Sequence, residues 1–200
     1  MAGKKTQEIS FQIPAPNIKL MKVRIQGTAP LIFHKWDEKA IKMILDKQMK
    51  KAQKGRDVRD PEKEYENSFY YDSNKNIAFP ARNIKQAIVG SARFLQGLPM
   101  TILRGSIFVV GDKDGMIPVK YKKKTMRQDM VTVGMGSADI RFRGQLDDWE
   151  MEFIIKFDAD ILSAEQTLNL LQRAGFSQGL GEWRPEKNGD SGTFTVAVKE

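Results

Sequence analysis

The sequence has no cysteine and a single histidine, His34, among its 200 residues. Without cysteine there are no disulfides, thiolate metal sites or cysteine nucleophiles, and such a composition fits a reducing compartment. One histidine does not make a zinc site by itself. No apolar run reaches membrane-spanning length, and no signal-peptide pattern is present. We therefore expect a cytoplasmic protein with no metal, no other cofactor and no membrane partner.

Catalytic motifs are scarce as well. The sequence contains no P-loop, zinc signature, nucleophile elbow or paired-carboxylate motif. Asp37, three residues after His34, is a weak catalytic candidate, and a simpler role for it is to cap the helix that follows. We therefore expect that the protein is not an enzyme.

What the sequence has in excess is positive charge. It carries 33 lysines and arginines against 25 aspartates and glutamates, which gives a net charge of +8. A surplus of this size favours a polyanionic partner, most simply nucleic acid. Apolar residues make up 40% of the chain, which is enough for the core of one globular domain.

A glycine-rich stretch at residues 175–198, GFSQGLGEWRPEKNGDSGTFTVAV, is the most informative part of the chain. Glycines permit positive φ and close backbone approach, so such a loop can lie against a partner. An arginine beside a tryptophan suits a phosphate or a base. The alternative is a plain connection whose glycines only form turns. The side chains that we expect to contact a ligand here are Trp183, Arg184 and Lys187.

Hydrophobic periodicity and turn residues predict an α+β fold. The expected strands lie near residues 19–26, 68–72, 76–79, 106–110, 149–157 and 193–198. The expected helices lie near residues 38–54, 83–96 and 163–174, and residues 56–67 are expected to form a mobile loop. Simplified, this order is βαββαβ, the ferredoxin-like or RNA-recognition-motif topology. We expect an extended arm at 1–18 and one domain at 19–200, with insertions at about 35–78 and 112–146.

The second insertion is strongly basic, and we expect it to form a long β-hairpin or loop. Phosphate contacts need only cations within reach, and interleaved aromatic residues suit base stacking. The alternative is a solvated run of charge with no ligand. The candidate binding residues of this insertion are Tyr121, Lys122, Lys123, Lys124, Arg127, Arg141 and Arg143.

The start of the helix at 83–96, in the segment FPARNIK, is a second candidate anion site. Arg82 and Lys85 flank a helix N-terminus, where backbone N–H groups favour negative charge. An ordinary helix start with surface cations is the alternative. Pseudo-twofold symmetry of the βαββαβ topology predicts that the glycine-rich stretch packs near this helix start.

Three features together resemble the RAMP superfamily, the ferredoxin-like RNA-binding proteins of CRISPR effector complexes. They are the apolar–proline loop IQGTAPLIFH after the first strand, the proline-led helix FPARNIKQAIVGSAR, and the glycine-rich GLGEWRPEKNGDSGTF before the last strand. Pro80, Ile84 and Lys85 match the helix motif typical of the family, whereas Ala81 and the residues Arg82, Asn83 and Gln86 do not. The chain also resembles uncharacterised proteins of tailed phages.

The resemblance implies a non-catalytic, RAMP-like subunit that binds single-stranded RNA or DNA and assembles as a homo-oligomer along it. Some members of the family cut RNA with an acidic residue after the first strand. One alternative is therefore a metal-dependent endoribonuclease using Asp37, together with His34. A further alternative is a phage assembly or host-interaction protein whose basic surface meets an acidic protein.

Overall fold

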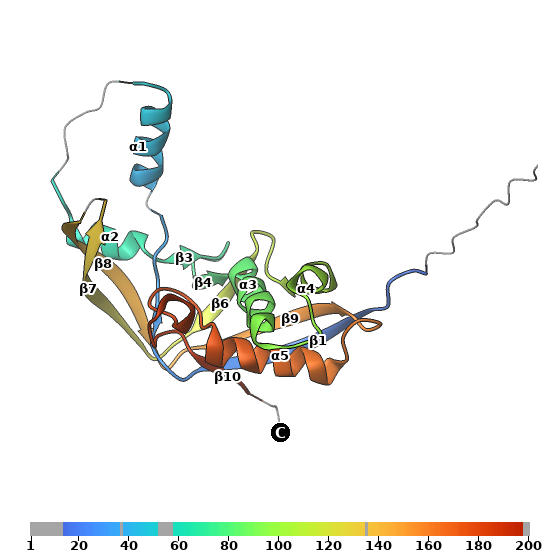
Figure 1. Cartoon of the computed structure of the whole chain (residues 1–200). Helices are drawn as coiled ribbons and strands as arrows, with labels where there is room; N and C mark the ends of the chain where they lie inside the picture. Colours follow the sequence, from blue (N-terminus) through green and yellow to red (C-terminus); the bar gives the residue numbers. More distant parts are fainter. Residues whose placement is uncertain (1–13, 37, 52–57, 135, 198–200) are drawn as a thin grey trace, which may run out of the picture.

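A computed structural model describes residues 14–36, 38–51, 58–134 and 136–197, and it confirms a mixed α+β fold with antiparallel sheets (Figure 1). The strands are β1 Ile18–Gly27, β2 Leu31–Ile32, β3 Tyr70–Tyr71, β4 Ile77–Pro80, β5 Ile107–Val110, β6 Met116–Lys120, β7 Lys123–Val133, β8 Ser137–Asp147, β9 Glu150–Asp158 and β10 Phe194–Ala197. The α-helices are α1 Glu38–Gln48, α2 Pro61–Asn67, α3 Ala81–Ser91, α4 Met100–Ser106 and α5 Ala164–Ser177. Short 3-10 helices cover Ala92–Phe94 and Pro185–Lys187.

The main sheet has the order β10-β1-β9-β6-β4-β3, and β5 also pairs with β9. Period-two alternation on β1 and β9 defines its two faces. Val23 lies opposite Phe153 and Ile25 opposite Met151, and all four side chains are buried. Because paired residues in an antiparallel sheet point to the same side, these residues form one apolar face.

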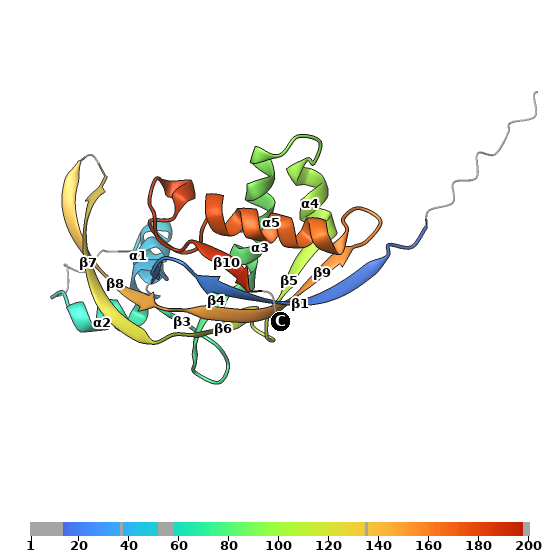
Figure 2. The same cartoon turned by 90° about the horizontal axis from the view of Figure 1, so that it is seen from below.

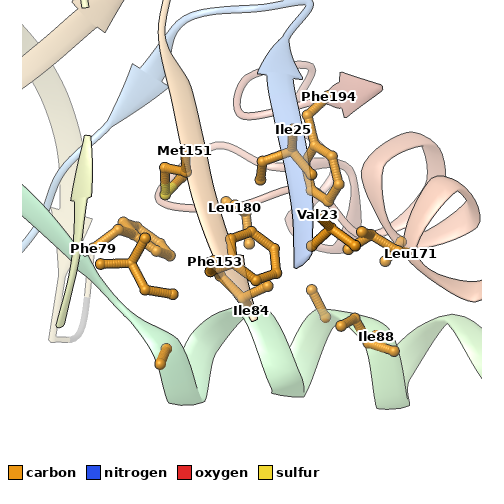
Figure 3. Packing of buried hydrophobic residues seen from close by; sticks show 14 of the residues in the cluster. Val23, Ile25, Phe79, Ile84, Ile88, Met151, Phe153, Leu171, Leu180 and Phe194 are labelled. Carbon is orange, nitrogen blue, oxygen red and sulfur yellow. The ribbon is translucent and has the colours of Figure 1, made fainter. Parts of the chain in front are cut away.

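Helices α3, α4 and α5 all lie on one side of the main sheet (Figure 2). Ile84 and Ile88 of α3 and Leu171 of α5 point toward the apolar face of β1 and β9 and form the core with it (Figure 3). Helix α5 starts at the predicted capping box. Ser163 Oγ accepts from the Gln166 backbone N–H at 3.1 Å, and Gln166 Oε1 accepts from the Ser163 N–H at 2.8 Å.

The predicted basic hairpin is confirmed as an antiparallel ribbon of β7 and β8, which extends beyond the main sheet (Figures 1 and 2). Strand β2 pairs with the base of β8 to make a three-stranded sheet. Residues 116–120, which were placed in the insertion, instead form β6 of the main sheet, between β4 and β9. Pro118 is exposed on this strand, between the buried Ile117 and Val119.

Helix α1 stands apart from the main body (Figure 1). It ends at Gln48, earlier than residue 54 where the pattern placed its end. Its apolar residues are largely exposed, with Ile41, Ile44 and Leu45 each between 42% and 51% accessible. In the described part of the chain, no other element covers the apolar stripe of this helix.

One further prediction of local structure was wrong. Part of the expected mobile loop is helix α2, which Asp60 caps by accepting from the Lys63 N–H at 3.2 Å and which begins at Pro61. Tyr65 is the one buried side chain of this helix, and the charged residues around it gave no apolar pattern that would predict a helix. The strand expected at 106–110 is confirmed as β5, and the residues just before it form α4, a helix that was not predicted and whose Leu103 and Ser106 are buried.

Candidate nucleic-acid interface

The loop at residues 178–193, which we call the glycine loop, is held against the β1–β2 connection by backbone hydrogen bonds. The N–H of Glu182 donates to the carbonyl of Ile32 at 3.0 Å, and that of Gly192 donates to Pro30 at 2.8 Å. Gly181 has a φ of +75°, and a Cβ on it would lie 2.3 Å from the Ile32 carbonyl oxygen. The close approach therefore requires glycine at position 181.

Alternation divides the ribbon into two faces. One face lies partly against α2: the Phe69 ring fills the space beside Gly144, and Lys124 bonds Glu66 of the helix at 2.8 Å. The other face, which we call the polar face, carries four cations and three carboxylates. Its charged residues are Lys123, Arg127, Asp129, Asp139, Arg141, Arg143 and Asp147.

Asp129 joins the polar face to the glycine loop. Its carboxylate accepts from Arg127 Nε at 2.6 Å, from Arg143 Nη1 at 3.0 Å and from Trp183 Nε1 at 3.1 Å. Asp129 and Arg143 are both buried. Burial alone would raise the pKa of Asp129, but the hydrogen bonds from Arg127, Trp183 and Arg143 outweigh it and lower that pKa.

A second polar contact lies on the other side of Arg143. His34 Nδ1 is 3.1 Å from Glu182 Oε1, and Arg143 Nη2 is 3.5 Å from the same ring nitrogen. The hydrogen bond from His34 is the largest cause that lowers the pKa of Glu182, although burial opposes it. The end of β2, the ribbon and the glycine loop therefore share one connected set of polar contacts.

These pKa shifts predict acid sensitivity. A carboxylate with a lowered folded pKa adds stability above its unfolded value, about 4, and that stability is lost as the pH falls through the folded pKa. We expect the melting temperature to hold near neutral pH and to fall below about pH 4. In Glu182→Gln the fall between pH 5 and pH 3 should be smaller, and an identical fall in both proteins would contradict the assigned role of Glu182.

A cavity of about 120 Å³ opens between the glycine loop, the end of β2 and the start of α3. The loop lies beside this helix start, as the topology predicted: Gly181 and Arg184 line the same cavity as Asn83 and Gln86. Tyr70 and Phe79 contribute aromatic rings to the lining. In the residues that the structure describes, no group of three or more His, Asp or Glu side chains is placed to hold a metal ion.

No protein-family model and no curated protein matches the sequence. Comparison with solved structures finds similar folds. A chain of the Type III-B Cmr-beta complex, solved bound to its cognate target RNA, has a TM-score of 0.55 and 10% sequence identity. The match covers 92% of this protein and 60% of that chain, so the protein spans less than two thirds of its length.

Cmr6 from Pyrococcus furiosus is also similar, with a TM-score of 0.47 and 10% identity over 90% of this protein and 98% of Cmr6. Both proteins are RAMP-type CRISPR Cmr subunits. At 10% identity the likeness to the Cmr-beta chain concerns the fold alone.

The structure brings several of the predicted binding residues to one side. Arg127, Arg141 and Arg143 share the polar face with Lys123, and Trp183 reaches it from the glycine loop. Trp183 keeps 38% of its surface exposed. Lys122 and Tyr121 lie beside the base of the ribbon and are also exposed.

Other predicted residues lie elsewhere or already have partners. Lys85 points toward α4, where its Nζ donates to the Arg104 carbonyl at 2.8 Å above the Phe108 ring. Arg184 donates to Glu186 at 2.7 Å and to the Gly181 carbonyl at 2.7 Å, so its charge is matched. Arg82 and Lys187 are exposed, with no ion pair among the described residues. Asp37, the catalytic candidate, lies outside the described residues.

Sequence reasoning missed the residues that organise the site. Asp129 is an isolated acid in a basic strand, and that contrast was the available signal for a buried counter-ion. Asn83 and Gln86, three residues apart on α3, lie on one side of a helix and could have been paired by that spacing. Nothing in the sequence linked His34 to Glu182, which are 148 residues apart.

Proposed function

We propose that this protein is a non-catalytic subunit that binds single-stranded nucleic acid, RNA or DNA, and assembles cooperatively along it. One observation carries the proposal. Hydrogen bonds that join Asp129 to Trp183 and Arg143, and from there through His34 to Glu182, connect the polar face of the ribbon with the lining of the cavity beside α3. Cations that reach phosphate and an aromatic ring that stacks on a base are the two components of single-strand binding.

The electrostatics favour contact at particular cations. All three arginines of the polar face are paired with carboxylates, so the net charge of the ribbon overstates the charge that is available to phosphate. Lys123 has no ion pair among the described residues, and Lys122 is paired with Asp148 only at 3.7 Å. Arg127 donates its Nε to Asp129 at 2.6 Å, but its side chain is 41% exposed, so its terminal N–H groups can still contact a phosphate. These three cations are therefore the ones that we assign to the phosphate backbone.

The proposal includes a ferredoxin-like core. Strands β10, β1, β9 and β5 are adjacent in that order and antiparallel, with α3 between β1 and β5 in the chain and α5 between β9 and β10. This agrees with a βαββαβ unit to which β6, β4, β3 and the ribbon are added. Assembly of several copies is supported by the exposed apolar side of α1 and by Met130, which is 76% exposed on the ribbon.

The test is fluorescence anisotropy with labelled 30-nucleotide RNA and DNA at several salt concentrations. The triple variant Lys122→Glu, Lys123→Glu, Arg127→Glu should bind at least about tenfold more weakly, with a shallower salt dependence. If copies assemble cooperatively, the binding curve against protein concentration should become steeper as the strand is lengthened.

A matched control separates local contact from bulk charge. Arg104→Glu, Lys113→Glu and Arg173→Glu change the net charge equally at exposed positions away from the ribbon. This variant should lose much less affinity than the ribbon variant. Equal losses would contradict the assignment to the ribbon, and no binding of wild-type protein to either strand at low salt would reject the function.

A further inference from the structure

The cavity beside α3 presents neutral polar groups that are free to bind. The hydroxyl of Tyr70 and the side-chain amides of Asn83 and Gln86 line it, and none of them has a hydrogen-bond partner among the described residues. Burial raises the pKa of Tyr70, so its hydroxyl keeps its proton at neutral pH. Each amide offers both a donor and an acceptor, and a neutral tyrosine offers the same.

The charged groups of the cavity are already matched. Glu182 is bonded to His34, and Glu186 is bonded to Arg184. The lining holds two carboxylates against one arginine, Arg184, and the lowered pKa of Glu182 keeps that group ionised. A phosphate in this cavity would meet like charge. The lining therefore suits an uncharged ligand that has hydrogen-bonding groups.

The size of the cavity restricts the ligand further. At about 120 Å³ it is smaller than pockets for drug-sized molecules, which hold roughly 300–1,000 Å³. It is bounded by the aromatic rings of Phe33, Tyr70 and Phe79 and by backbone of the glycine loop. A small planar ring with polar edges fits such a space.

We propose that this cavity holds one unpaired nucleobase, extruded from a bound strand, and that the amides of Asn83 and Gln86 contact its hydrogen-bonding edge. The inference rests on the proposed function and adds a site to it. Arg82, exposed one residue before Asn83, and the polar face beyond Trp183 are placed to meet the backbone on either side. Asparagine and glutamine pair well with adenine because their amides match its donor and acceptor.

The test compares strands that differ only in their bases. The probes are 20-mers of adenosine as RNA, deoxyadenosine as DNA, and an abasic DNA of equal length. The double variant Asn83→Ala, Gln86→Ala should bind both adenine strands about tenfold more weakly, because it removes the amides that contact the base edge. Its affinity for the abasic strand should equal that of the wild type.

The control variant is Asn169→Ala, Gln96→Ala, which removes the same two side chains from exposed positions outside the cavity. It should bind every strand as the wild type does, and all three proteins should melt at similar temperatures. Unchanged binding of the cavity variant to adenine strands overturns the base site while leaving nucleic-acid binding intact. Equal loss on adenine and abasic strands also overturns it, because the amides would then contact the backbone. Failure of wild-type protein to bind any strand rejects the function and the base site together.

Discussion

Replacing Asp129 by asparagine is expected to lower the free energy of unfolding by about 3–5 kcal/mol, because it leaves a buried arginine without its counter-ion. Arg143 is 5% exposed, and Asp129 is the carboxylate that its Nη1 contacts. Asparagine keeps the shape of the side chain but has one acceptor oxygen, so besides the charge either Arg127 or the pair Arg143 and Trp183 loses its acceptor. The measurement is urea unfolding of both proteins at neutral pH.

Asp139→Asn is the matched control for this variant. Asp139 lies on the other strand of the same ribbon and pairs with Arg59 and Arg141, each at 2.8 Å, in a more exposed setting. Exposed pairs contribute about 0–1 kcal/mol, so this variant should unfold close to the wild type. Similar small losses in both variants would show that Arg143 does not depend on Asp129.

Replacing Gly192 by alanine is the second change with a large expected effect. The residue has a φ of +68°, and a Cβ would lie 1.8 Å from the carbonyl oxygen of Leu180. The atom in the way belongs to the backbone of Leu180. This backbone cannot move away easily, because the Leu180 N–H donates to the Gly192 carbonyl at 2.9 Å. We expect a loss of stability above about 3 kcal/mol, in the range that marks severe strain.

Gly97→Ala separates the two causes of this loss. Gly97 has a φ of +83°, but a Cβ there would meet nothing within 4 Å. Its replacement should lower the free energy of unfolding by only about 1–2 kcal/mol, which is the cost of holding alanine in the left-handed backbone conformation. Thermal and urea unfolding of both variants measure the difference, and equal costs would mean that the glycine loop moves to accommodate the methyl group.

Much of the main sheet could be predicted because its pattern is local. The alternation of Met151, Phe153, Ile155 and Phe157 identifies a strand and its buried face without any knowledge of the partner strands. The capping box at Ser163 likewise lies within four residues. Helix α2 could not be found in this way, because its one buried residue, Tyr65, gives no period to detect.

The site was predicted less well than the fold, for a physical reason. Composition showed which cations were present, but whether a cation is free depends on the carboxylate that folding brings to it. Arg184 is neutralised by Glu186, two residues away, whereas Arg143 is neutralised by Asp129 from the opposite strand. Sequence spacing could suggest the first pair, but the second follows only from the register of the ribbon.

The position of β1 has a consequence for how the chain folds during synthesis. This strand is made early, yet both of its neighbours, β9 and β10, come from residues after 149. Chains are made at roughly 5–20 residues per second, so both edges of β1 stay unpaired for several seconds. Contacts between such distant segments also slow folding. We therefore expect this domain to reach its native state only after β10 has been made, and to need protection from aggregation until then.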